Sequence, residues 1–217
     1  MARRSIAFAL LLVAAPALRG QGKSPRVDLS LPEPIVAGTS VPTASITGVL
    51  TEGHRQELLN AGWQTAIHLR LELWRKGRFG IFDRESVLEW DVIVEYSPAA
   101  KTYHVRRIVD NKVDDLGGEV SGIDAAELLL RRPYTPALSP ERRGDRYFYL
   151  FNAEVSTLSL SDLEAWQRWI KGEAQPAVRG QKSPVGAFQR GLGSLLSRVL
   201  GGDTQTYETR SAVFSAG

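Results

Sequence analysis

Hydrophobic and polar residues alternate in two long runs near the middle of the chain. The first run places these residues on the apolar side of a two-residue repeat: Trp63, Thr65, Ile67, Leu69, Leu71 and Leu73. The second run does the same with Leu88, Trp90, Val92, Val94 and Tyr96. Because side chains alternate across a strand, the pattern predicts a hairpin of two amphipathic strands with a polar loop near Lys76 to Glu85. Its apolar face must be covered by other elements.

The register of this hairpin decides which side chains reach the core. The pattern predicts that Leu71 and Val92 are buried on the covered face. The polar side carries Gln64, His68, Arg70 and Glu72 in the first strand, and Glu89, Asp91 and Glu95 in the second. We therefore expect Arg70 and Asp91 to stay unburied, since a shift by one residue would exchange the two faces.

Weaker patterns predict the remaining elements of the domain. Strands are expected at Val27 to Leu31, Thr43 to Leu50, Tyr103 to Val109 and Arg146 to Leu158, and helices at Thr51 to Ala61, Asp124 to Arg132 and Leu160 to Ile170. Asp110 to Gly122 is polar and glycine-rich, which is typical of a connection. The strand from Arg146 is apolar on both sides in its first half, which predicts a central or helix-covered position. The fold class indicated is α+β, with a meander-like antiparallel sheet of about five or six strands and helices on one face.

The N-terminus has the layout of a secretory signal peptide. Two arginines, Arg3 and Arg4, precede an apolar run from Ile6 to Ala17, and small residues follow. The run is short for a membrane span, although an uncleaved anchor is an alternative. We expect residues 1–20 to direct export to the periplasm or cell envelope, with the mature chain beginning between Leu18 and Lys23.

The C-terminal third is predicted to lie outside the folded domain of residues 21–172. Residues 173–184 are expected to be a flexible linker, residues 185–202 an amphipathic helix and residues 203–217 a disordered tail. The apolar stripe of this helix consists of Val185, Phe188, Leu192, Leu195, Leu196 and Val199. We expect the stripe to contact another envelope protein, a lipid surface or its own domain. Of these, an interaction element is favoured, with a domain that folds without it.

Composition narrows the classes of function only slightly. The chain has 217 residues, 43% of them hydrophobic, a formal net charge of +3 and a pI near 9.3. This mild basicity, without a basic patch interleaved with aromatics, does not indicate nucleic-acid binding. The chain has no cysteine, which excludes disulfides and a lipoprotein anchor.

Candidate chemistry is sparse. The three histidines lack the spacing of a metal motif, and neither a catalytic serine motif nor a phosphate loop is present, so we expect no metal and no cofactor. Glu89 and Asp91 are expected to lie about 7 Å apart on one strand face, a distance seen in hydrolases but equally in a solvated face. Trp74, Phe79 and Phe82 are candidates for lining an apolar groove, although anchoring of the core and the loop explains them as well.

Several segments together resemble an uncharacterised bacterial family of exported, β-rich envelope proteins. They are LLNAGWQTAIHLRLELWRKGRFGIFDRE, EWDVIVEYSPAAKTYHV, DAAELLL, YFYLFNAEV and SLSDLEAWQRWI. The resemblance covers about Val27 to Lys171 and implies an exported β-rich module without assigning an activity or a catalytic residue. The leading hypothesis is a non-enzymatic binding or scaffold module. The alternatives are a carrier of a lipid or other amphiphile, and a hydrolase with an unrecognised site.

Overall fold

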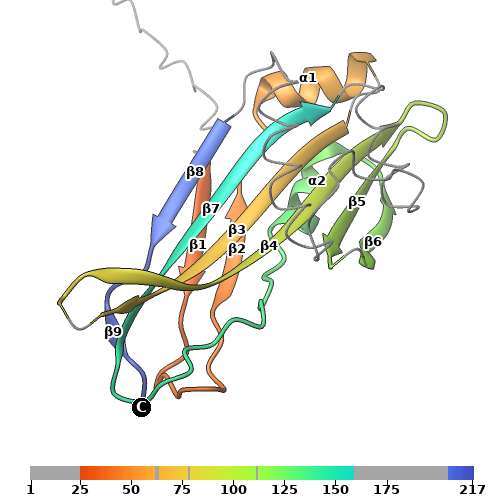
Figure 1. Ribbon diagram of the computed structural model, residues 1–217. Helices are drawn as coiled ribbons and strands as arrows, with labels where there is room; N and C mark the ends of the chain where they lie inside the picture. The colour runs from red at the N-terminus through yellow and green to blue at the C-terminus, as the bar shows by residue number, and fades with distance from the viewer. Residues whose placement is uncertain (1–24, 62–63, 78, 111, 159–204) are drawn as a thin grey trace, which may run out of the picture.

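The protein is β-rich, as a computed structural model of the chain shows (Figure 1). The structure describes residues 25–61, 64–77, 79–110, 112–158 and 205–217. These residues form a seven-stranded antiparallel sheet, a two-stranded sheet and two short helices. The predicted signal segment, the helix from Leu160, the linker, the amphipathic helix with its apolar stripe, and Trp63 lie outside the described residues.

The predicted central hairpin is confirmed. Strand β3 (Gln64–Lys76) pairs antiparallel with β4 (Phe82–Ser97), and their register brings Leu71 opposite Leu88. The face that carries Leu71 packs in the core, where Leu71 is 0% exposed and Val92 is also buried. We call this the inner face and the opposite one the outer face.

One part of the register prediction is wrong. Asp91 lies on the outer face as expected, yet it is buried, with 6% exposure, because neighbouring strands flank it and it forms a hydrogen bond with His68. Arg70 was predicted not to be buried, and it is half-buried. Long polar side chains on adjacent strands cover one another, which alternation alone does not reveal.

The strand order in the main sheet is β6-β5-β4-β3-β7-β8. The further strands are β5 (Thr102–Val109), β6 (Lys112–Val120), β7 (Arg146–Leu158), β8 (Gln205–Arg210) and β9 (Phe214–Ser215), which pairs with the start of β7. The expectation that β7 is central is confirmed, since β3 and β8 pair with its two sides.

Two segments that the sequence pattern placed outside the sheet belong to it. Residues 110–122 contain β6, an edge strand in which only Leu116 is buried. Residues 203–217 were predicted to be a disordered tail, but residues 205–217 contain β8 and β9. Both edge strands are polar, as exposed sheet edges commonly are, so they lack the apolar alternation of a half-buried strand. The sheet therefore has more strands than the five or six expected.

A second layer covers the inner face. It includes the paired strands β1 (Arg26–Ser30) and β2 (Thr43–Thr47), which lie behind the main sheet in Figure 1. Helix α2 (Ile123–Leu130) contacts β2, β5 and β6, and α1 (Glu52–Ala61) contacts β3 and β4. The core between the layers contains Val27 and Ile46 from β1 and β2, and Phe151 from β7. Burial of such apolar side chains is the dominant stabilising contribution to the fold.

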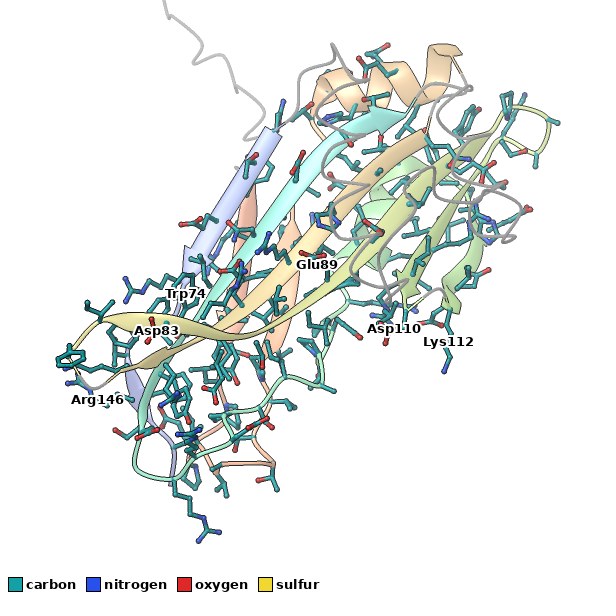
Figure 2. The ribbon with its side chains drawn as sticks, viewed as in Figure 1. Trp74, Asp83, Glu89, Asp110, Lys112 and Arg146 are labelled. Atoms are coloured by element: carbon teal, nitrogen blue, oxygen red, sulfur yellow. The ribbon has the colours of Figure 1, made fainter. Side chains whose placement is uncertain are left out.

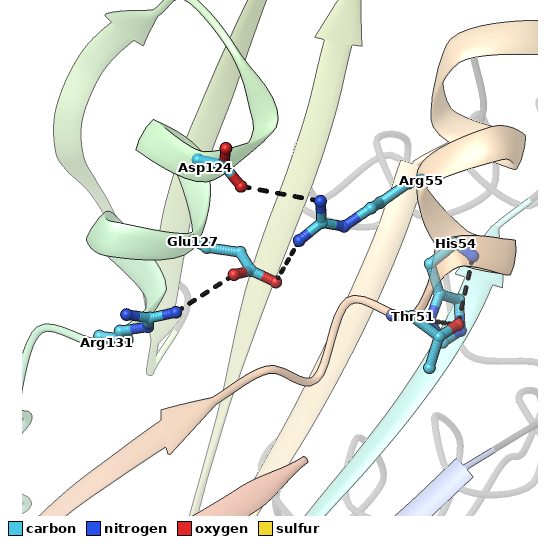
Figure 3. A network of polar contacts seen from close by, with 6 residues as sticks. All are labelled: Thr51, His54, Arg55, Asp124, Glu127 and Arg131. Carbon is cyan, nitrogen blue, oxygen red and sulfur yellow. Dashed lines mark hydrogen bonds and ion pairs between the residues drawn. The ribbon is translucent and has the colours of Figure 1, made fainter. Parts of the chain in front are cut away.

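An ion-pair network joins the two helices (Figure 3). Arg55 of α1 donates a hydrogen bond from Nη2 to Oε1 of Glu127 in α2 at 3.0 Å. Arg131 lies 3.3 Å from the other carboxylate oxygen of Glu127, and Arg55 is also 3.7 Å from Asp124. Because Glu127 is buried, its charge requires these partners, and the network links α1 to α2.

Candidate functional site

The outer face of the main sheet carries rows of charged side chains on β3 and its neighbours. The strand register brings Asp91 and Glu154 beside His68, on either side of it. In the next row Glu89 lies beside Arg70. We call His68, Arg70, Glu72, Glu89 and Asp91 the charged face. Each member lies there because the two-residue repeat of the strand points it away from the core.

Glu72 has three polar partners on the outer face. Its Oε1 lies 2.6 Å from Arg70 and 3.2 Å from Arg84, while its Oε2 accepts a hydrogen bond from the indole of Trp74 at 2.7 Å. Arg70 also lies 3.5 Å from Glu89. These contacts satisfy buried carboxylates and hold the side chains in one arrangement, so they have a sufficient structural explanation.

His68 and Asp91 form a further pair on the charged face. Nδ1 of His68 lies 2.9 Å from Oδ1 of Asp91, and both side chains are largely buried. Burial alone would lower the pKa of His68, but the hydrogen bond and charge of Asp91, with Glu89 and Glu154 nearby, raise that pKa overall. The pair therefore favours the protonated imidazole over the neutral one more than water does.

Replacing His68 with Gln is expected to destabilise the fold more at about pH 5.5 than at about pH 8.5. The pKa of His68 is raised above the ordinary histidine value of 6.5 in the folded state, so its stabilisation is fully present below that value. It is lost as the pH rises through the folded-state pKa. Urea unfolding of both proteins across this range measures the difference. If the loss of stability caused by His68→Gln grew with pH, the raised pKa of His68 would be contradicted. Asp91→Asn should remove most of the pH dependence of that loss.

The three groove candidates do not come together. Trp74 stacks on Phe148 with ring centroids 5.9 Å apart, and Phe82 meets the same ring edge-on at 4.9 Å. The guanidinium of Arg210 lies 3.7 Å from the centre of the Phe148 ring. Phe79 is separate from this cluster and is 94% exposed. The cluster fixes the base of the β3–β4 hairpin, and sequence analysis missed Phe148 and Arg210 as its members.

Phe79 belongs to the tip of the β3–β4 hairpin, which protrudes at the end of the sheet opposite α1 (Figure 1). Ile81 follows it in the tip and is 67% exposed. The turn is closed by hydrogen bonds from Gly77 N–H to the Ile81 carbonyl at 2.7 Å and from Gly80 N–H to the Gly77 carbonyl at 3.1 Å. Gly80 has a φ of 80°, a conformation that side-chain-bearing residues rarely adopt. A closed turn therefore presents two apolar side chains to solvent.

The loop that precedes β7 lies beside this hairpin. Arg75 of β3 lies 3.4 Å from Asp145 of the loop and also 3.4 Å from Glu85 of β4. The Tyr147 hydroxyl accepts a hydrogen bond from the backbone N–H of Arg142 at 3.0 Å. Figure 2 shows Arg146 near the hairpin that carries Asp83. The Arg75–Asp145 contact thus holds this loop, with its arginines, beside the base of the hairpin.

This end of the molecule is basic. The described residues among 75–85 and 141–146 include six Lys or Arg and four Asp or Glu, a net charge of +2. Arg142, Arg143 and Arg146 are exposed. We call residues 75–85 and 141–146 the basic end. Arg142 and Arg143 are neighbours in the sequence, but their position beside the base of the hairpin depends on the fold of the sheet.

Glu89 and Asp91, the carboxylates weighed for hydrolysis, lie next to Arg70 and His68 respectively. No group of three potential metal ligands occurs within the described ranges. Among the helices that the structure describes, none has the length and apolar character needed to cross a membrane. Comparison with protein-family models, curated proteins and solved structures finds no match to this chain. The resemblance to the exported bacterial family stays a prediction.

Proposed function

We propose that this chain is a non-enzymatic binding module of the cell envelope that recognises its partner through the basic end. The observation that carries the proposal is the exposure of Phe79 and Ile81 at the tip of a hairpin whose base is packed and whose turn is closed. Aromatic side chains commonly dominate binding energy when a partner buries them. A rigid hairpin also loses little conformational entropy on binding.

The proposal extends to the whole chain. Residues 1–20 direct export and the remaining chain forms an α+β module, with residues 185–202 as an amphipathic helix that adds a second contact. The layout of the first residues and the resemblance to exported envelope proteins support this organisation. The α+β assignment is supported by α1 and α2, which pack with the strands.

A photo-crosslinking residue placed at position 79 tests this proposal in the living host. We expect light-dependent adducts from position 79, because the partner buries that side chain. The matched control is position 128 on α2, where Leu128 is also an exposed apolar residue. Adducts of equal yield at the two positions, or none at position 79, would contradict recognition through the basic end.

A further inference from the structure

We infer that the partner of the basic end is an anionic membrane surface, into which Phe79 and Ile81 insert while neighbouring arginines contact lipid phosphates. This inference rests on the proposed function and names the class of its ligand. Three features of the described residues carry it: the shape of the tip, the hydrogen bonding of its backbone and the charge around it.

The protruding shape of the tip suits insertion into a membrane surface better than docking on a flat protein surface. Its two exposed apolar residues lie in the turn of a protruding hairpin, so they reach a planar surface ahead of the strands (Figure 1). Phe and aliphatic side chains can enter the boundary between headgroups and acyl chains, where each adds buried apolar area. Two side chains give only weak, reversible attachment, which is why a second attraction is required.

Part of the backbone of the tip is already hydrogen-bonded, which lowers the cost of moving it toward a poorly hydrated environment. Unpaired N–H and C=O groups are costly away from water, and this cost excludes lipid-exposed loops from the hydrocarbon core of a membrane. Here the N–H groups of Gly77 and Gly80 are both donated within the turn. Insertion of Phe79 and Ile81 therefore leaves these two donors satisfied.

The charges around the tip supply the second attraction. Glu85 and Asp145 both lie next to Arg75, which neutralises part of the acidic charge at this end. The exposed cations Arg142, Arg143 and Arg146 exceed the exposed acids Asp83 and Glu141. Cations near an anionic leaflet each add to membrane affinity, and the attraction weakens as salt screens it. The excess of cations favours anionic over neutral lipid.

Binding to two kinds of vesicle tests the inference. The chain is purified from its host in the processed form found there, and is sedimented with vesicles of phosphatidylcholine alone or of phosphatidylcholine with phosphatidylglycerol. We expect stronger binding to the anionic vesicles and a loss of that preference at high salt. Inorganic phosphate at the same ionic strength should not compete more than chloride does. If phosphate displaces the chain from vesicles more than chloride does, the ligand of the basic end is free phosphate and the membrane inference is overturned.

Two variants separate the apolar and the charged contributions. Phe79→Ser with Ile81→Ser should weaken binding to anionic vesicles at least about tenfold. Arg142→Glu with Arg143→Glu should weaken binding to anionic vesicles by about tenfold or more. Binding of this variant to neutral vesicles should be unchanged. The control Leu128→Ser removes an exposed apolar residue from α2 and should bind as the unmodified chain does. Circular dichroism checks that each variant is folded.

A dye gives a direct view of insertion. The chain has no cysteine, so Phe79→Cys and Leu128→Cys each allow labelling at one position with an environment-sensitive fluorophore. We expect a blue shift with anionic vesicles from position 79 alone. Equal responses at the two positions, or unchanged binding of the tip variant, would overturn the inference. Position 79 could form crosslinks to a protein in cells while the purified chain fails to bind vesicles. That combination would overturn the lipid assignment and leave the proposed binding module intact.

Discussion

Removing residues 205–217 is expected to abolish the cooperative unfolding transition of the chain. These residues form β8 and β9, which pair with β7 in the main sheet. Phe214 of β9 stacks on Tyr147 and Tyr149, and Ala216 is buried. Without them, a central strand becomes an unpaired edge and its core aromatics are exposed to water. Such an edge also favours aggregation.

The expected loss is large relative to the stability of a domain. Burial of each large apolar side chain contributes about 1.5–3 kcal/mol, and the deletion removes Phe214 and Tyr207 and exposes parts of Tyr147 and Tyr149. The total approaches the free energy of unfolding of a typical domain, which is roughly 5–15 kcal/mol. The predicted domain of residues 21–172 lacks β8 and β9, which pair with β7 in the structure. We therefore expect that segment not to fold alone.

Urea unfolding followed by tryptophan fluorescence measures this effect. Glu208→Gln is the control, since Glu208 is exposed on β8 and the change leaves the strand pairing intact. A peptide of residues 203–217 added in trans should restore a cooperative transition to the truncated chain. A truncated chain with an unchanged urea midpoint would show that β8 and β9 contribute little.

The elements that could be predicted from sequence are those with strong apolar alternation. The hairpin of β3 and β4 has long runs in which every second residue is apolar, and β7 begins and ends at Arg146 and Leu158 as predicted. Burial of one face strongly specifies the register of such strands, so Leu71 and Val92 were placed correctly. The two helices were likewise indicated, by Thr51 at the start of one and by the acid-first sequence of the other.

The elements that were missed depend on partners far away in the sequence. Strand β8 reads QTYETR, in which Tyr207 is the sole large apolar residue, and it becomes a strand by pairing with β7. Its β-favouring Thr and Tyr residues were the available signal. The candidate site shows the same limit. Phe79 was predicted as a groove candidate and is instead exposed at the hairpin tip. The loop that carries Arg142 and Arg143 is held beside the hairpin by the contact of Arg75 with Asp145, which the sequence pattern does not reveal.

Replacing Phe151 with Ala is expected to destabilise the domain by about 3–5 kcal/mol. Phe151 lies at the centre of β7, is 1% exposed and stacks on Trp90 with ring planes 9° apart. Its neighbour across the strand pair is Leu71, which is itself buried. Strands on both sides hold the site, so the surrounding side chains have little freedom to fill the cavity that the substitution leaves.

Phe79→Ala is the matched control, because it removes the same side chain from a position that is 94% exposed. Its free energy of unfolding should stay within about 0.5 kcal/mol of the unmodified chain, as is usual for surface substitutions. Urea unfolding of the two variants gives both values. Equal costs at the two positions would mean that Phe151 is not in the core or that the hairpin tip packs against the domain. A large cost at Phe151 with none at Phe79 assigns one phenylalanine to the fold and leaves the other free for binding.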